Sequence, residues 1–270
     1  MCFSNLMVLI VDGCQFLSDV LPSHLLPFLT KLERLEVRDC SSVKTIFDVK
    51  CITEDRKMKT MEPALLPLPF SLKKLILEQL PNLENVWNED PHGFLKVQLL
   101  QEVVVKNCKC LTSLFPASVA KDLVKLENLF VKHCEGLMVI VAEDNADPKG
   151  TNLELTFPCM IESPDDKIIF GELQTLNLEY LPNLTSFYNG SFSLSFPSLE
   201  ELSVFNCHRM ETFCPGTINA DKLLRVKFEE NSDAIPLEID LNSTIRKAFL
   251  ATAESREEKE IDGKVSDEKE

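Results

Sequence analysis

Cysteine and histidine residues near the middle of the chain are the first candidates for chemistry. Cys108 and Cys110 form a Cys-x-Cys pair, and His133 and Cys134 follow about 26 residues later. Structural zinc sites use four Cys or His ligands arranged as a tetrahedron. No tetrahedral set of four is evident in this sequence. We therefore expect reduced structural thiols at these positions and no metal site.

The sequence lacks the residue patterns that two other kinds of catalytic or cofactor site require. A phosphate-binding loop has the pattern Gly-x-x-x-x-Gly-Lys-Ser/Thr, whereas residues 147–151, DPKGT, place similar letters in another order. The four histidines, His24, His92, His133 and His208, have no repeated serine or cysteine partner, so we expect them to be solvated. The sequence thus predicts no catalytic residue, no metal and no cofactor, and we expect a protein that is not an enzyme.

The overall charge also excludes some partners. The chain has 270 residues and a formal net charge of -15, which disfavours binding to nucleic acid phosphates or anionic lipids. The first residues, MCFSNLMVLIVDGC, lack the basic start of a signal peptide. No run of about 18 apolar residues is present, so we expect no membrane span and a cytoplasmic protein.

A short apolar pattern recurs along the chain. The template is Leu-x-x-Leu-x-Leu/Val-x-x-Cys/Leu/Asn, and most copies lie 24 to 28 residues apart, with two longer intervals of 40 and 47 residues. This period is that of a leucine-rich repeat. The eight copies begin at Leu6, Leu32, Leu72, Leu100, Leu126, Leu173, Leu199 and Leu223.

The copy that begins at Leu126 shows how each repeat is expected to fold. Leu129 and Val131 point to the same side of a short strand, which can be buried only against neighbouring copies. With Leu126 and Cys134 they form the expected structural core. The predicted fold class is α/β: a curved leucine-rich-repeat solenoid with a parallel β-sheet on its concave face and a mostly irregular convex side with short helices.

Five segments describe the expected domain organisation. Residues 1–240 form the repeat array, with charged and proline-containing insertions at 48–69 and 142–169. Residues 241–253 follow a capping Asp and have apolar residues at helical spacing, which predicts a short terminal helix. Residues 254–270 are mostly charged and lack aromatic residues, which predicts a disordered acidic tail.

The side chains that alternate with the core positions are the candidates for function. They point to the concave face, where apolar residues and a basic step are expected to form an exposed strip that binds a protein partner. The alternative is a repeat surface with accidental hydrophobic residues. The candidate protein-binding residues are Ile76, Val104, Lys106, Phe130, Lys132 and Phe205.

Several runs resemble one protein family. VVVKNCKCLTSLFPASVAKDLVKLENLFVKHCEGLMVIV, IIFGELQTLNLEYLPNLTSFY and FPSLEELSVFNCHRMETF resemble the leucine-rich-repeat region of plant coiled-coil nucleotide-binding disease resistance proteins. The ending DLNSTIRKAF is similar to the close of such receptors, and the resemblance covers nearly all of residues 1 to 250. It implies an intracellular module of plant innate immunity that recognises a pathogen effector or a guarded host protein and restrains a nucleotide switch.

The chain departs from that family because the coiled coil, the nucleotide-binding loop and the switch domain are absent. We therefore expect either a fragment of a longer receptor or a truncated gene product, and a missing nucleotide-binding domain of the same receptor becomes a further expected partner. The alternative function is a substrate adaptor of a ubiquitin ligase, as some cytosolic leucine-rich-repeat proteins are.

Overall fold

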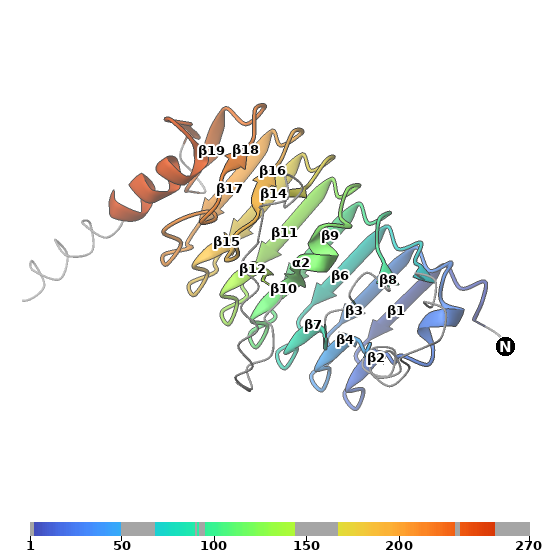
Figure 1. Cartoon of the computed structure of the whole chain (residues 1–270). Helices are drawn as coiled ribbons and strands as arrows, with labels where there is room; N and C mark the ends of the chain where they lie inside the picture. Colours follow the sequence, from blue (N-terminus) through green and yellow to red (C-terminus); the bar gives the residue numbers. More distant parts are fainter. Residues whose placement is uncertain are drawn as a thin grey trace, which may run out of the picture.

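A nine-stranded, almost entirely parallel β-sheet runs along the molecule in a computed structural model of the chain (Figure 1). The structure describes residues 3–49, 68–89, 91, 95–143, 167–229 and 233–251. In spatial order the strands are β1 (Val8–Asp12), β3 (Arg34–Arg38), β6 (Lys74–Glu78), β9 (Glu102–Lys106), β11 (Asn128–Lys132), β14 (Thr175–Glu179), β17 (Glu201–Phe205), β19 (Arg225–Lys227) and β20 (Ile235–Pro236).

The eight parallel strands pair in the register that the repeat template predicts. Leu129 of β11 lies beside Val103 of β9 on one side and Leu176 of β14 on the other, and these residues hold the same template position. The register persists across the two long intervals, from β3 to β6 and from β11 to β14. The predicted α/β leucine-rich-repeat fold is therefore confirmed.

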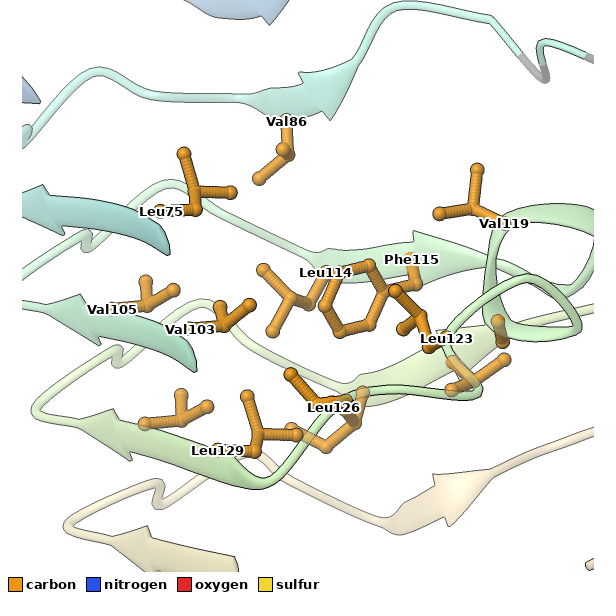
Figure 2. Close-up of a cluster of buried hydrophobic side chains, with 14 of the residues drawn as sticks. Leu75, Val86, Val103, Val105, Leu114, Phe115, Val119, Leu123, Leu126 and Leu129 are labelled. Atoms are coloured by element: carbon orange, nitrogen blue, oxygen red, sulfur yellow. The ribbon is translucent and has the colours of Figure 1, made fainter. Parts of the chain in front are cut away.

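The core lies between this sheet and the segments that follow each strand. Leu126, Leu129, Val131 and Cys134 have no solvent exposure, as expected for a strand that buries one face against its neighbours. Figure 2 shows Leu129 and Val103 from the sheet directed toward Leu114 and the neighbouring apolar side chains of the next layer. The template residues thus form one continuous core.

Short parallel strands add to the convex side, which the sequence predicts to be mostly irregular. One row of them is visible beside the large sheet in Figure 1, and each strand places apolar residues in the core. The row comprises β2 (Asp19–Leu21), β4 (Thr45–Phe47) and β7 (Asn85–Trp87), then β10 (Ser113–Pro116), β12 (Val139–Ala142) and β15 (Ser186–Tyr188). Two further small sheets consist of β5 (Leu68–Pro69) with β8 (Leu95–Lys96), and of β13 (Lys167–Ile169), β16 (Ser193–Ser195) and β18 (Ile218–Asn219).

Helical turns are few and short in the repeats. The 3-10 helix η1 spans Leu26–Phe28, and the α-helix α2 spans Ala117–Ala120 with Pro116 as its N-cap. The sequence predicts a helix over residues 118–125 at this place, so the observed helix begins earlier and is shorter. Its side chains Val119 and Ala120 are buried, which fixes the turn by packing.

Each five-residue strand of the large sheet is followed by a residue with a positive φ angle, and we call this place the strand-ending position. In six of these residues, from Gly13 to Tyr180, the backbone N–H donates to a carbonyl of the next strand, for example from Asn107 to Lys132 at 3.1 Å and from His133 to Glu179 at 3.1 Å. This left-handed conformation turns the chain sharply toward the core, and it suits Gly, Asn and Asp best. The residues are Gly13, Asp39, Gln79, Asn107, His133, Tyr180 and Asn206.

The two ends of the sheet differ. At the C-terminal end β20 pairs antiparallel with β19, and a helix over residues 241–251 inserts Leu241 and Ile245 into the core. The Asn242 side chain accepts hydrogen bonds from the backbone N–H groups of Phe213 and Cys214, at 2.8 and 3.2 Å. At the N-terminal end β1 has no strand on its outer side among the described residues. The predicted tail and the interiors of both predicted insertions lie outside the described residues.

The alternation of buried and open sides leads to a paired prediction. Replacing Leu129 with alanine removes a fully buried side chain and leaves a cavity, so we expect the free energy of unfolding to fall by about 2 to 5 kcal/mol. Phe130→Ala, on the other side of the same strand, should cost about 1 kcal/mol because Phe130 is only partly buried. Urea unfolding followed by circular dichroism measures both. Equal losses would contradict the assignment of the two faces.

The strand-ending turn gives a second prediction, at Gln79, whose φ is 56°. We expect Gln79→Gly to leave the free energy of unfolding unchanged or to raise it by up to about 1 kcal/mol, because glycine adopts this conformation without steric cost. Gln79→Val should lower it by about 1 to 2 kcal/mol. Gln101→Val is the matched control, since Gln101 is exposed and has no positive φ. Similar effects of valine at both positions would argue against strain at Gln79.

Candidate protein-binding face

The open face of the nine-stranded sheet is the side that points away from the core. In-register pairing places equivalent residues of successive strands next to one another on this face, so they form columns. The middle column consists of Ile10, Glu36, Ile76, Val104, Phe130, Asn177, Ser203 and Lys227. The rim column, at the carboxyl ends of the strands, consists of Asp12, Arg38, Glu78, Lys106, Lys132, Glu179 and Phe205.

The apolar part of the middle column is less exposed than the sequence predicts. Ile76 and Val104 are 6% and 8% exposed, although neither belongs to the core cluster. Phe205 of the rim column is also buried, at 7%. Adjacent strands lie only about 4.8 Å apart, so equivalent side chains cover one another. The expectation of an exposed strip is therefore wrong for these three residues, and Phe130 is the one candidate hydrophobic residue that remains partly accessible.

The predicted basic step at Lys106 and Lys132 is neutralised by neighbouring strands. The Lys106 ammonium lies 2.9 Å from a carboxylate oxygen of Glu78, and Lys132 forms an ion pair with Glu179. Each lysine stands beside its partner because the register sets the two residues next to one another. The two lysines thus contribute paired charges to the face and no net basic patch.

A buried carboxylate interrupts the apolar side chains of the middle column. Glu36 is 1% exposed and lies in register between Ile10 and Ile76. It forms ion pairs with Arg34 and with Arg38, the latter at 3.0 Å. A buried carboxylate needs such partners, since its desolvation would otherwise be costly. Arg38 also lies 3.2 Å from Glu78, so the charges on this side of the face form a connected network.

Three aromatic rings lie together at the edge of the open face, and we call them the rim cluster. His133 stacks on Tyr180 with ring centroids 4.4 Å apart, and Tyr180 meets the edge of Phe205 at 5.5 Å. His133 and Tyr180 occupy the strand-ending position, with φ of 54° and 56°. Of these three residues the sequence predicts only Phe205 as a protein-binding residue. His133 and Tyr180 could have been found from the sequence, because each is an aromatic side chain at a repeat position where glycine, asparagine and aspartate are best suited.

The cysteine and histidine candidates for a metal site are not brought together. Cys108 and Cys134 are buried neighbours, whereas Cys110 is exposed and His133 is engaged in the rim cluster. A hydrogen bond between the two buried thiols, together with burial, raises the pKa of Cys108 well above its ordinary value. Within the part of the chain that the structure describes, no three His, Cys, Asp or Glu side chains converge as a metal site would require.

The remaining sequence candidates are dispersed. His24 is exposed on the convex side and His208 is partly buried near the C-terminal helix. His92 and residues 147–151 lie outside the described residues. In the described ranges, no helix is both long enough and apolar enough to cross a membrane.

One comparison with known proteins gives a match. A family model described as "Plant disease resistance protein RPS2-like, leucine-rich repeats" matches residues 1–135, which is half of the chain. The matched segment includes the first five parallel strands of the sheet up to the exit turn after β11. No curated protein and no solved structure gives a significant match.

The thiol environments give a prediction about alkylation. Burial raises the pKa of Cys207 to about 12, so at pH 8 only roughly one molecule in ten thousand carries the reactive thiolate at this position. We expect iodoacetamide to modify the exposed Cys110 at pH 8 while Cys207 stays unmodified, as measured by peptide mass spectrometry. Between pH 8 and pH 10 the rate at Cys207 should rise about tenfold per pH unit, since its thiolate fraction does. Equal rates at both residues in the folded chain at pH 8 would contradict this, and the unfolded chain is the control.

Proposed function

This chain belongs to the leucine-rich-repeat family of RPS2-like plant disease resistance proteins, and we propose that it is a non-catalytic recognition module of plant innate immunity that binds a protein on the open face of its sheet. The partner class is a pathogen effector or a guarded host protein. A nucleotide-binding domain of the same receptor is the further partner, and binding to it would restrain that domain's switch.

The single observation that carries the proposal is the composition of the open face around Phe130. Phe130 is a partly buried aromatic residue on a rigid strand, with Val104 and Ile76 packed beside it in the middle column. Rigid aromatic residues that are surrounded by buried side chains commonly contribute most of the binding energy of a protein interface. We place the centre of the binding face at Phe130, with Ile76 and Val104 as its apolar support.

The paired lysines suit the border of such an interface. Lys106 and Lys132 are 41% and 33% exposed, and their partners Glu78 and Glu179 are less exposed. Because the Lys106–Glu78 pair is open to solvent and contributes little stability, Lys106 can turn toward a carboxylate of a partner at small cost. Lys132 stays paired with Glu179, since the Glu179 side chain is only 8% exposed and a buried carboxylate that loses its partner is destabilising. Phe205 and the other two rings of the rim cluster continue the face beyond Glu179.

The state of the cysteines supports a cytoplasmic location for this module. The described cysteines are free thiols, including the stacked Cys108 and Cys134. In an oxidising compartment, neighbouring thiols such as these could form disulfides while the chain folds. The cytosol keeps thiols reduced.

A set of surface variants tests the binding face. The chain serves as bait in extracts of infected plant tissue, and mass spectrometry quantifies the captured proteins for wild type, Phe130→Ala and the double variant Lys106→Glu/Lys132→Glu. We expect the specific partner to be lost at least tenfold with either variant, since removal of an interface centre costs about 2 kcal/mol or more. Circular dichroism should remain that of the wild type.

The matched controls change similar residues away from the open face. Met138→Ala removes an exposed apolar side chain from the convex side. Lys109→Glu/Lys125→Glu reverses two lysines of the exposed pairs with Glu135 and Glu172. Both controls should retain the partner. A partner captured equally by the open-face variants and the controls would place recognition elsewhere.

A further inference from the structure

The open face of the nine-stranded sheet divides into two parts that differ in charge pairing. On β3, β6, β9 and β11, every charged side chain of this face forms an ion pair with the same strand or a neighbouring one. The basic members of these pairs are Arg34, Arg38, Lys74, Lys106 and Lys132. The charges of this part of the face are therefore compensated within the chain, and Phe130 is its accessible apolar residue.

The next two strands, β14 and β17, instead present neutral polar side chains in the middle column. Asn177 lies beside Phe130 and Ser203 lies beside Asn177, and all three side chains are partly exposed. Among the described residues, neither the Asn177 amide nor the Ser203 hydroxyl has a hydrogen-bonding partner. An asparagine side chain offers two N–H donors and a carbonyl acceptor, and a serine hydroxyl both donates and accepts. These groups are thus free to bind another molecule.

Lys227 continues the middle column on β19, next to Ser203. Its side chain is partly exposed and forms neither an ion pair nor a hydrogen bond within the described ranges. The other cation of this strand, Arg225, donates to the Ala234 carbonyl at 2.8 Å and is thereby held toward the segment that leads into β20. The chain has 43 acidic and 28 basic residues, so a lysine of this face without a carboxylate is an exception. The Lys227 ammonium is available to an anionic group of a partner.

The side chains from Phe130 to Lys227 form a row whose chemistry changes from strand to strand. From β11 to β19 the row presents an aromatic ring, an amide, a hydroxyl and an ammonium group. Neighbouring strands lie about 4.8 Å apart, so the row spans about 14 Å. An extended peptide rises about 3.3 Å per residue and covers this distance with about four residues. The row therefore matches a short peptide segment that lies across the strands.

We propose that this row binds an extended peptide segment of the protein partner, with an apolar side chain on Phe130 and an Asp or Glu side chain about four residues away at Lys227. The site rests on the proposed function, because it specifies which kind of partner segment the same face binds. Main-chain N–H and C=O groups of the peptide pair with Asn177 and Ser203, which can serve both kinds of group. Since main-chain groups are the same in every peptide, Phe130 and Lys227 select the sequence.

The charges around the row favour a single carboxylate over a polyanion. Glu179 and Glu201 also lie on the open face of β14 and β17, so Lys227 is a local cation in an acidic surrounding. Binding to nucleic acid depends on several lysine or arginine contacts to phosphates. One available ammonium group and a net charge of -15 do not meet that need. A carboxylate in an otherwise neutral peptide does fit, because it requires one cation only.

Selection of binders from a library of random peptides on the full chain tests the proposal. Peptides bound by the wild type should be enriched in an apolar residue and an Asp or Glu about four residues apart, in either chain direction. Lys227→Glu should lose these peptides and select Lys or Arg at the acidic position, because the charge of the site is reversed. Lys222→Glu changes an exposed lysine outside the strands and is the matched control, which should select the wild-type peptides.

The affinity of one selected peptide tests the middle column itself. The peptide is synthesised with blocked ends, so that its terminal carboxylate cannot contribute, and its binding is measured by fluorescence anisotropy. Asn177→Leu should weaken binding roughly tenfold, because the amide no longer pairs with the main chain of the peptide. Thr175→Val changes the same strand and the same face outside the middle column, so this variant should bind as the wild type does. Circular dichroism checks that each variant remains folded.

The outcome can be distinguished from that of the proposed function. A partner that is lost with Phe130→Ala and retained with Lys227→Glu would leave the proposed function in place and overturn the peptide site. A library without enriched peptides, or enriched peptides without an acidic residue, would overturn it as well. Acidic peptides that bind folded Lys227→Glu as tightly as the wild type would do the same.

Discussion

In-register parallel pairing between repeats is the constraint on which the rest of the structure depends. A strand such as β11 buries Leu129 and Val131 only because β9 and β14 stand on both sides of it in the same register. The long intervals between β3 and β6 and between β11 and β14 do not disturb this, since the entropy of closing a loop grows slowly with its length. The order of the sheet is therefore set by the template and not by the spacing between its copies.

The same register decides the electrostatics of the open face. Glu78 forms ion pairs with Arg38 of one neighbouring strand and with Lys106 of the other. The residues that compensate a charge such as that of Glu78 consequently lie roughly one repeat away in sequence and not beside it in the chain. Glu36 is the exception, because the partners that compensate this buried carboxylate between Ile10 and Ile76 are Arg34 and Arg38 of its own strand. A face built in this way changes its charge pattern through pairs of substitutions in adjacent repeats.

Much of the fold could be predicted from the sequence, because the template positions have a direct structural meaning. The copy at Leu126 identifies its strand, its buried side and its buried thiol. The accessibility of Ile76 and Val104 could not be predicted in the same way, since it depends on how closely equivalent side chains cover one another. β20 was not predicted either, because Ile235–Pro236 pairs antiparallel and carries no copy of the template. The repeat pattern thus predicts to which side a side chain points and which residue lies beside it. The exposure of that side chain follows from packing across strands.

At the strand-ending position two neighbouring repeats depart from the others, because they carry His133 and Tyr180 there. Asn107 and Asn206 adopt a positive φ there at little cost, whereas a tyrosine in that conformation is unfavourable unless other contacts compensate. For Tyr180 the compensation is visible, since its ring lies between His133 and Phe205. The ring stacking stabilises the strained residue and at the same time fixes three aromatic side chains at the edge of the open face. A position that is purely structural in most repeats has thereby become, in two neighbouring repeats, a rigid part of the surface that we propose for recognition.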